Sequence, residues 1–291
     1  MFLEGSILAA FGAMLFWGFG DFFVQRETRK VGDMESLVFI SSIGAIGLFP
    51  FVISELPTLF TMQNVLLLSF IGIVTFITSI IDFEALKQGK LSVVEVIIEI
   101  ELPVSVVLGF LFLKETLTFS QFFTILLIFA GIVMTSMRSF SGAHLAEFKK
   151  LEKGALLALL AAVWMGFMNF FVAVGSKQVS PLMVIWLPWL VIAIVSLFFI
   201  FRGGEFGKLV KNAHKFRRLI LVTGIIDTLG WLLYAMALAE NELSIVTAIT
   251  ESYPAITVFL GVLINKEKIL PHQYGGAALA LSAGFALAMM V

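Results

Sequence analysis

The chain has 291 residues, of which 60% are hydrophobic and 13% charged, and its formal net charge is −1. A soluble domain typically has about 25% charged and about 45–50% apolar residues, so the surplus apolar surface predicts a protein that faces lipid. The nearly neutral charge argues against nucleic acid as a partner. The absence of cysteine excludes disulfides and thiolate metal sites.

The chain begins with an apolar segment that no lysine or arginine precedes. A secretory signal normally starts with positive charge, so we expect the first helix to be retained. Ten apolar segments are each close to the roughly 20 residues that cross a bilayer as a helix. They cover residues 6–25, 34–53, 64–84, 91–112, 119–138, 154–174, 182–201, 219–239, 243–264 and 272–291.

Near-continuous apolarity within each segment favours helices over the alternating strands of a membrane barrel. We therefore predict an all-α integral membrane protein with ten transmembrane helices. The break at 139–153 is a linker between two halves. The basic break at 202–218 is open to two interpretations, an amphipathic helix on an anionic membrane surface or a solvated loop that holds the topology.

The second half of the sequence repeats the first. A shift of 148 residues aligns the first helix with the sixth, and a shift of 152 aligns the later helices. The aligned pairs include Gly18 with Gly166, Glu99 with Glu251, Gly109 with Gly261 and Lys114-Glu115 with Lys266-Glu267. We predict five-helix repeats at 1–138 and 154–291. Because five is odd, the second repeat should be inverted, as in many secondary transporters with a site near the bilayer midplane.

The last segment carries small residues every four positions, at Gly276, Ala280, Gly284 and Ala288. Such a stripe permits close helix contact, either within the fold or in a homodimer through the last helix.

Loop charges predict the orientation in the membrane. The breaks after helices 1, 3, 5, 7 and 9 hold 17 of the 19 lysines and arginines, and the other side holds only Lys114 and Lys177. Since basic loops stay cytoplasmic, we expect a plasma-membrane protein with both termini outside.

Four acidic residues fall near predicted helix centres, at Glu99, Glu101, Asp227 and Glu251. Each costs about 2.5–3.5 kcal/mol to insert as an anion, and such residues usually face a cavity or a partner. No lysine, arginine or histidine lies at a similar depth, so we expect them to be protonated, hydrated, hydrogen-bonded or balanced by a cation. Because they occupy equivalent positions, Glu99 and Glu251 are predicted to meet across the twofold axis.

Other candidates surround these acids. Glu95 shares the helix face of Glu99, and Glu101 points away from that face. Cavity-wall candidates are Trp17, Trp231, Tyr234, Tyr253 and Asn169, and gate or hinge candidates are Pro103 and Pro254. Each of these has a plainer interpretation as packing, and Glu115 and Glu267 are expected to bind lysines or helix ends.

The sequence resembles the EamA type of the drug/metabolite transporter superfamily. The resemblance rests on Leu15-Phe16-Trp17-Gly18, on a proline inside helices 4 and 9, and on the Gly-to-Lys-Glu segments 109–115 and 261–267. It implies a central cavity lined by helices 1, 3, 4, 6, 8 and 9, and alternating access by rocking of helix bundles.

We therefore expect a secondary transporter of a small amine, amino acid or related cationic or zwitterionic solute, with the midplane carboxylates as a route to proton coupling. The alternatives are a neutral sugar or metabolite facilitator and a divalent-cation permease. An enzyme is not expected, because no nucleophile–base set or phosphate-binding glycine loop occurs. No cofactor or metal site is predicted, since the three histidines lie far apart.

Overall fold

The computed structural model describes residues 5–88, 97–136, 153–256 and 270–291, and within these ranges the regular elements are all helices. The first repeat contains α1 (Gly5–Val31), α2 (Asp33–Val52), the 3₁₀ helix η1 (Ile53–Phe60), α3 (Met62–Gln88), α5 (Glu101–Leu108), the π-helical turn η2 (Gly109–Leu113) and α6 (Phe119–Ser136). The second contains α8 (Lys153–Gln178), α9 (Pro181–Arg202), α10 (Phe206–Glu240), α11 (Leu243–Thr250) and α13 (Pro271–Ala288).

Local sequence explains where these helices begin and end. Ser180 accepts a hydrogen bond from the Met183 amide at 3.0 Å, and Pro181 follows at the first helical position, which starts α9. Gly32 has φ +97°, so it separates α1 from α2 in a conformation that a side chain would strain.

Six described helices are long and apolar enough to cross a membrane, and the shorter apolar stretches Glu101–Leu113 and Phe119–Thr135 accompany them. The prediction of an all-α membrane protein is therefore confirmed, whereas the count of ten spans stays a prediction.

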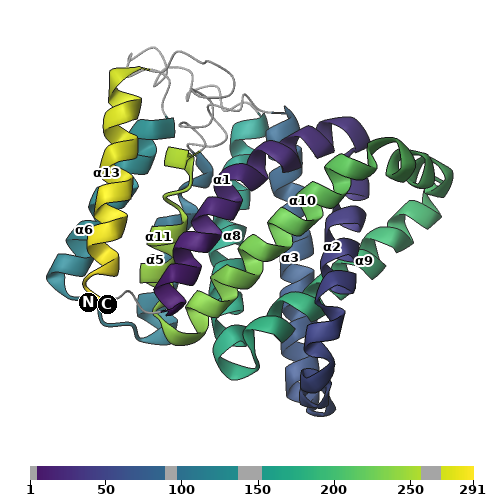
Figure 1. Cartoon of the computed structure of the whole chain (residues 1–291), viewed down its shortest axis with the longest axis horizontal. Coiled ribbons are helices and arrows are strands. Elements are labelled where there is room, and N and C mark those ends of the chain that lie inside the picture. The colour runs from purple at the N-terminus through teal and green to yellow at the C-terminus, as the bar shows by residue number, and fades with distance from the viewer. Residues whose placement is uncertain (1–4, 89–96, 137–152, 257–269) are drawn as a thin grey trace.

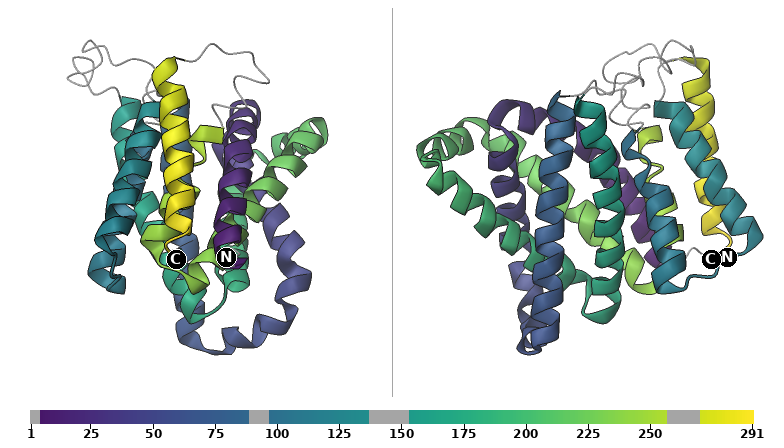
Figure 2. Two further views of the ribbon diagram at one scale, coloured as in Figure 1. Left: turned by 60° about the vertical axis from the view of Figure 1, so that its left-hand side comes forward. Right: turned by 180° about the vertical axis from the view of Figure 1, so that it is seen from behind.

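The packing between the repeats has twofold symmetry. A twofold axis requires each contact between repeats to recur with the equivalent helices exchanged. Accordingly, α1 packs on α10 as α3 packs on α8, and α2 packs on α10 as α9 packs on α3. The pairs α2–α9 and α6–α13 each unite equivalent helices and lie on the axis. In Figure 1 and Figure 2, α1 begins and α13 ends at the same edge of the molecule.

Both predicted prolines lie beside a break in a helix. Glu99 and Ile100 form a turn between the helical residues 97–98 and α5, and Pro103 is the third residue of α5. Residues 251–253 form the equivalent turn after α11, and Pro254 begins the helical residues 254–256. Broken helices at equivalent positions of two inverted repeats are a recurring feature of transporter binding sites, because they free backbone groups near the midplane.

The basic segment 205–218 is helical from Phe206 onward and forms the first part of α10, which bends at Phe216 (φ −111°, ψ 17°). It is held to α2 by Glu35, which is 2% exposed, pairs with the Lys208 ammonium at 2.9 Å and accepts from the Asn212 amide at 2.7 Å. Of the two interpretations of this segment, the helix is the one the structure shows. Its position on a membrane surface stays a prediction.

The small-residue stripe of the last helix packs within the chain. A Cβ on Gly276 would lie 2.6 Å from the Gly131 carbonyl oxygen of α6, and a Cβ on Gly131 would lie 2.6 Å from the Ala280 amide nitrogen. Gly276 and Gly131 thus let the backbones of α6 and α13 touch, as in other small-residue contacts between membrane helices. A homodimer through the last helix, which stays a prediction, would need another face of α13.

Candidate functional site

A cavity of about 140 Å³ lies between the two repeats. The described helices that contribute side chains to it are α1, α2, α3, α8, α9 and α10, together with the two broken segments around Glu101 and Glu251. The family resemblance implied all of these except α2 and α9. Leu37, Ile40 and Ser41 of α2 and Trp189 and Ile192 of α9 are therefore additions from the structure.

The cavity is acidic. Asp82, Glu101, Asp227 and Glu251 all line it, whereas none of its described lining residues is a lysine, arginine or histidine. Three of these side chains are buried, and Asp227 is partly exposed. Hydroxyl groups of Ser41, Thr75, Thr78 and Ser79 and the amide of Asn169 supply further polar contacts. Carboxylates within a largely apolar wall attract positive charge, and no described lining residue is basic.

Aromatic side chains form much of the remaining wall. Trp17 and Trp231 lie edge to face with ring centroids 5.0 Å apart, and Trp189 lies 6.2 Å from Trp231. Glycines make room for these rings. A Cβ on Gly230 would lie 2.7 Å from the Trp17 ring, and one on Gly44 would lie 2.1 Å from the Trp189 ring. Trp189 is fixed further by its indole N–H, which donates to the Thr228 hydroxyl at 3.2 Å.

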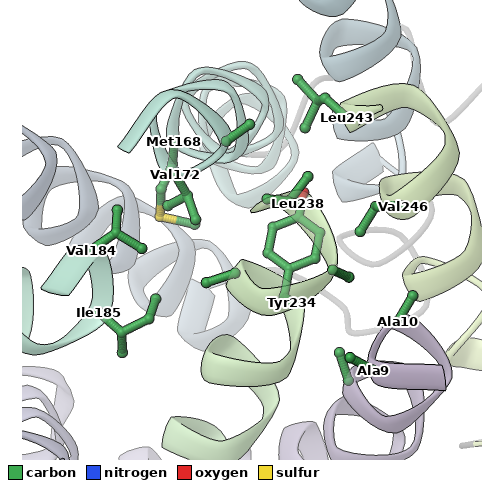
Figure 3. Close-up of a cluster of buried hydrophobic side chains, with 14 of the residues drawn as sticks. Ala9, Ala10, Met168, Val172, Val184, Ile185, Tyr234, Leu238, Leu243 and Val246 are labelled. Atoms are coloured by element: carbon green, nitrogen blue, oxygen red, sulfur yellow. The ribbon is translucent and has the colours of Figure 1, made fainter. Parts of the chain in front are cut away.

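Tyr234 lies behind this wall rather than in it. Its side chain is fully buried, its hydroxyl is 2.7 Å from the Thr247 hydroxyl, and its ring is 5.1 Å from that of Trp17. Figure 3 shows the ring among Leu238, Val246 and other core side chains. Tyr234 therefore supports Trp17 and Trp231 from the core and does not line the cavity.

The two halves of the cavity are equivalent in position but different in chemistry. With the repeat shift of 152, Thr75 corresponds to Asp227 and Glu101 to Tyr253, and all four residues line the cavity. The cavity therefore lies on the pseudo-twofold axis. Its second-repeat half is richer in aromatic side chains, and its first-repeat half is richer in hydroxyls.

Among the predicted acids, Asp227 and Glu251 line the cavity, as do the predicted wall residues Trp17, Trp231, Tyr253 and Asn169. Glu99 is buried but does not line it, whereas Glu101 does. Glu101 begins α5, directly after the turn at Glu99 and Ile100 that interrupts the helix. Glu95 lies outside the described residues, and the hinge roles of Pro103 and Pro254 stay predictions.

The structure identifies two further residues, Trp189 and Glu27, that the sequence analysis did not predict. Trp189 could have been found from its indole donor, which needs a partner when buried. Glu27 is fully buried in the last turns of α1, beyond the point where the apolar segment was expected to end. No pattern of spacing distinguished it from a loop residue.

Glu115 stands apart from the cavity and holds the start of α11. Its carboxylate accepts hydrogen bonds from the Leu243 amide, from the Ser244 amide at 3.1 Å and from the Ser244 hydroxyl at 2.5 Å. The expectation that Glu115 binds a helix end is confirmed. Glu242 precedes α11, and its pKa is raised. The larger cause is partial burial, and the second is the neighbouring Glu115 carboxylate.

Three comparisons place the chain among known proteins. The model of the EamA-like transporter family matches twice, at residues 5–137 and 152–289. The uncharacterized protein MJ1333.1 of Methanocaldococcus jannaschii is 29% identical over 136 residues, which are 46% of this chain and 98% of that protein, so this relative has the length of one repeat. A solved crystal structure, described only as that of a protein, shares the fold with a TM-score of 0.71 and 15% identity over 99% of each chain. With both repeats matched, the chain belongs to the EamA-like transporter family.

Proposed function

We propose that this membrane transporter carries a small organic cation, such as a primary or methylated amine, by alternating access with proton coupling. The observation that carries the proposal is the central cavity, where four acidic side chains and an aromatic wall occur together and no described lining residue is basic. An anionic or phosphorylated solute is disfavoured because nothing in this lining would balance its charge.

The aromatic wall supports an ammonium group as the occupant. A cation over a tryptophan or tyrosine face gains about 0.5–2 kcal/mol, and more when both partners are shielded from water. Trp17, Trp231 and Tyr253 face the same cavity as Asp227 and Glu251, so an ammonium ion there would have both ring faces and carboxylates. At about 140 Å³ the cavity is smaller than the pockets of about 300–1,000 Å³ that hold drug-sized ligands, which favours a small solute.

Proton coupling follows from competition for the same carboxylates. A protonated Asp227 or Glu251 no longer attracts an ammonium ion, and a bound ammonium ion opposes protonation of either acid. Exchange of protons for amine across the membrane then requires only that the cavity open to one side at a time. The broken segments at 99–100 and 251–253 adjoin the cavity and are the proposed sites of that movement, with Pro103 and Pro254 as hinge candidates.

The test is transport by the purified protein in proteoliposomes. Substrate-evoked currents are recorded on a solid-supported membrane at pH 6 and pH 8 with methylated amines, neutral amino acids, sugars and divalent cations. Wild type is compared with Asp227→Asn and Glu251→Gln, and with Glu205→Gln as a control at an exposed acid outside the cavity.

Amine-evoked, pH-dependent currents that are lost in both cavity variants and retained in Glu205→Gln are the expected result. Uptake of a sugar without current, unaffected by either cavity variant, would overturn the cationic-substrate proposal. Currents from divalent cations alone would indicate a cation permease instead, although the described residues contain no group of three acids or histidines placed to hold a metal ion.

A further inference from the structure

A buried acid outside the cavity lies where α1 packs against α10. Glu27 has 0% exposure, although its neighbours Arg26, Arg29 and Lys30 are exposed at the basic end of α1. Among the described residues, neither of its carboxylate oxygens has a hydrogen-bond partner of acceptable geometry. A carboxylate buried in this way is strongly disfavoured as an anion, so its place in the fold requires an explanation.

The polar groups nearest to Glu27 come from α10. The Thr223 hydroxyl and the Asp227 carboxylate both interact with it electrostatically. The Thr223 hydroxyl donates its hydrogen bond to the Leu219 carbonyl oxygen at 2.9 Å, so its oxygen can only accept a further one. Thr223 and Asp227 are four residues apart and therefore lie on one face of α10, one above the other.

The two helices run in opposite directions along this contact. A Cβ on Gly12 would meet Leu233, and a Cβ on Gly20 would meet Ile226, so residues later in α1 contact residues earlier in α10. Val24 and Asp227 both line the cavity. Glu27 therefore lies one turn beyond the cavity wall, between Asp227 and the exposed basic end of the molecule.

Other charged groups around Glu27 already have partners or face outward. On α2, Glu35 is bound to Lys208 and Asn212, and Asp33 has a partner of its own. On α10, Lys215 lies over the Phe216 ring at 5.0 Å from its centroid, and Arg217 and Arg218 are exposed. On α1 itself, Lys30 lies 5.3 Å from the same ring centroid. Within the described part of the chain, no cation pairs with Glu27.

We propose that Glu27 is a proton-transfer site that links Asp227 in the cavity, past Thr223, to the basic end of the molecule. In this step the Asp227 carboxylic acid loses a proton and the Glu27 carboxylate gains one, so the charge of the pair is unchanged. Glu27 then releases the proton at the basic end, which the loop charges assign to the cytoplasm. Proton binding by Glu27 stands by itself, whereas its link to transport rests on the proposed function.

Infrared difference spectroscopy tests proton binding without any substrate. Purified protein is titrated from pH 9 to pH 5 while the carbonyl stretch of protonated carboxylic acids is recorded. Glu27→Gln is expected to remove one component of that band, and Glu35→Gln, which changes another buried glutamate at the same end, is expected to retain it. Identical bands in wild type and folded Glu27→Gln would overturn the proton site.

A second pair of variants tests the role of Thr223 beside Glu27, and this test does not depend on the folding of Glu27→Gln. Thr223→Val is expected to move the midpoint of that component by about 0.5–1 pH unit, the effect of losing one polar neighbour. Thr124→Val in α6 removes a threonine that also donates to its own helix, to the Ser120 carbonyl oxygen, and should leave the midpoint unchanged. Equal midpoints in both variants would contradict the arrangement.

Transport then tests the link to the cavity. In proteoliposomes, Glu27→Gln is expected to keep amine-for-amine exchange and to lose most of the uptake driven by a pH gradient. Gradient-driven uptake at the wild-type rate, in a variant that lacks the infrared component, would overturn the link while leaving the proposed transport of amines intact.

Discussion

The buried acids of this protein have different roles, and burial alone does not distinguish a structural acid from a binding acid. Glu115 is buried like the cavity acid Glu251, and its carboxylate accepts from three donors at the start of α11. Glu251 and Asp227 line the cavity, whereas Glu115 does not. The immediate neighbours therefore separate a structural acid from a candidate binding acid, and each kind predicts a different response to loss of charge.

Glu115→Gln is expected to lower the free energy of unfolding by about 2 kcal/mol, because the amide replaces one acceptor oxygen with a donor that faces the amides of α11. Thermal unfolding followed by size-exclusion chromatography in detergent would show this as a lower midpoint temperature. Glu205→Gln, at an exposed and solvent-screened ion pair, should change it little. Equal midpoints for the two variants would contradict the capping role.

Trp231→Leu is expected to weaken the binding of a methylated amine about 2–30-fold, the range that corresponds to loss of a cation–π contact of about 0.5–2 kcal/mol. Competition against a labelled amine in proteoliposomes measures this. Trp164→Leu removes a tryptophan of α8 that lies outside the cavity lining and serves as the matched control. An equal loss in both variants would show general damage to the fold.

At the scale of helices, the backbones of α6 and α13 touch at Gly131 and Gly276. Gly276→Val is expected to prevent this packing, because its new Cβ would lie within 2.7 Å of the Thr135 amide nitrogen and of the Gly131 carbonyl oxygen. The yield of monodisperse protein in detergent is the measurement. The adjacent Gly275 has nothing within 4 Å of an added Cβ, so Gly275→Val should preserve the yield and controls for the poor helix propensity of valine.

Sequence reasoning was most reliable for whole helices and least reliable where a helix breaks or ends. Apolar length and the repeat register predicted the helical membrane fold, because both depend on averages over many residues. The place of Glu101 in the cavity wall could not be predicted from helical spacing, since a turn at Glu99 and Ile100 interrupts the helix before it. Glu27 was missed for a related reason: α1 continues to Val31, and packing against α10 buries an acid that the sequence surrounds with basic residues.

At the scale of the whole molecule, the orientation in the membrane is open to a direct measurement. Because the chain has no cysteine, single cysteines can be introduced without background. Gln178→Cys, at the exposed end of α8, is expected to react in intact cells with a membrane-impermeant maleimide. Val210→Cys, on the basic segment of α10, should react only after the cells are permeabilised. The reverse pattern would place both termini in the cytoplasm.

The unequal halves of the cavity have a consequence for the energetics of the transport cycle. In a protein built from two identical inverted repeats, the inward-open and outward-open conformations would be related by symmetry and equal in free energy. Here Thr75 corresponds to Asp227 and Glu101 to Tyr253, so opening to one side would expose different chemistry from opening to the other. Under the proposed alternating access, the empty carrier is therefore expected to rest open to one side, and a solute to meet unequal affinities at its two entrances.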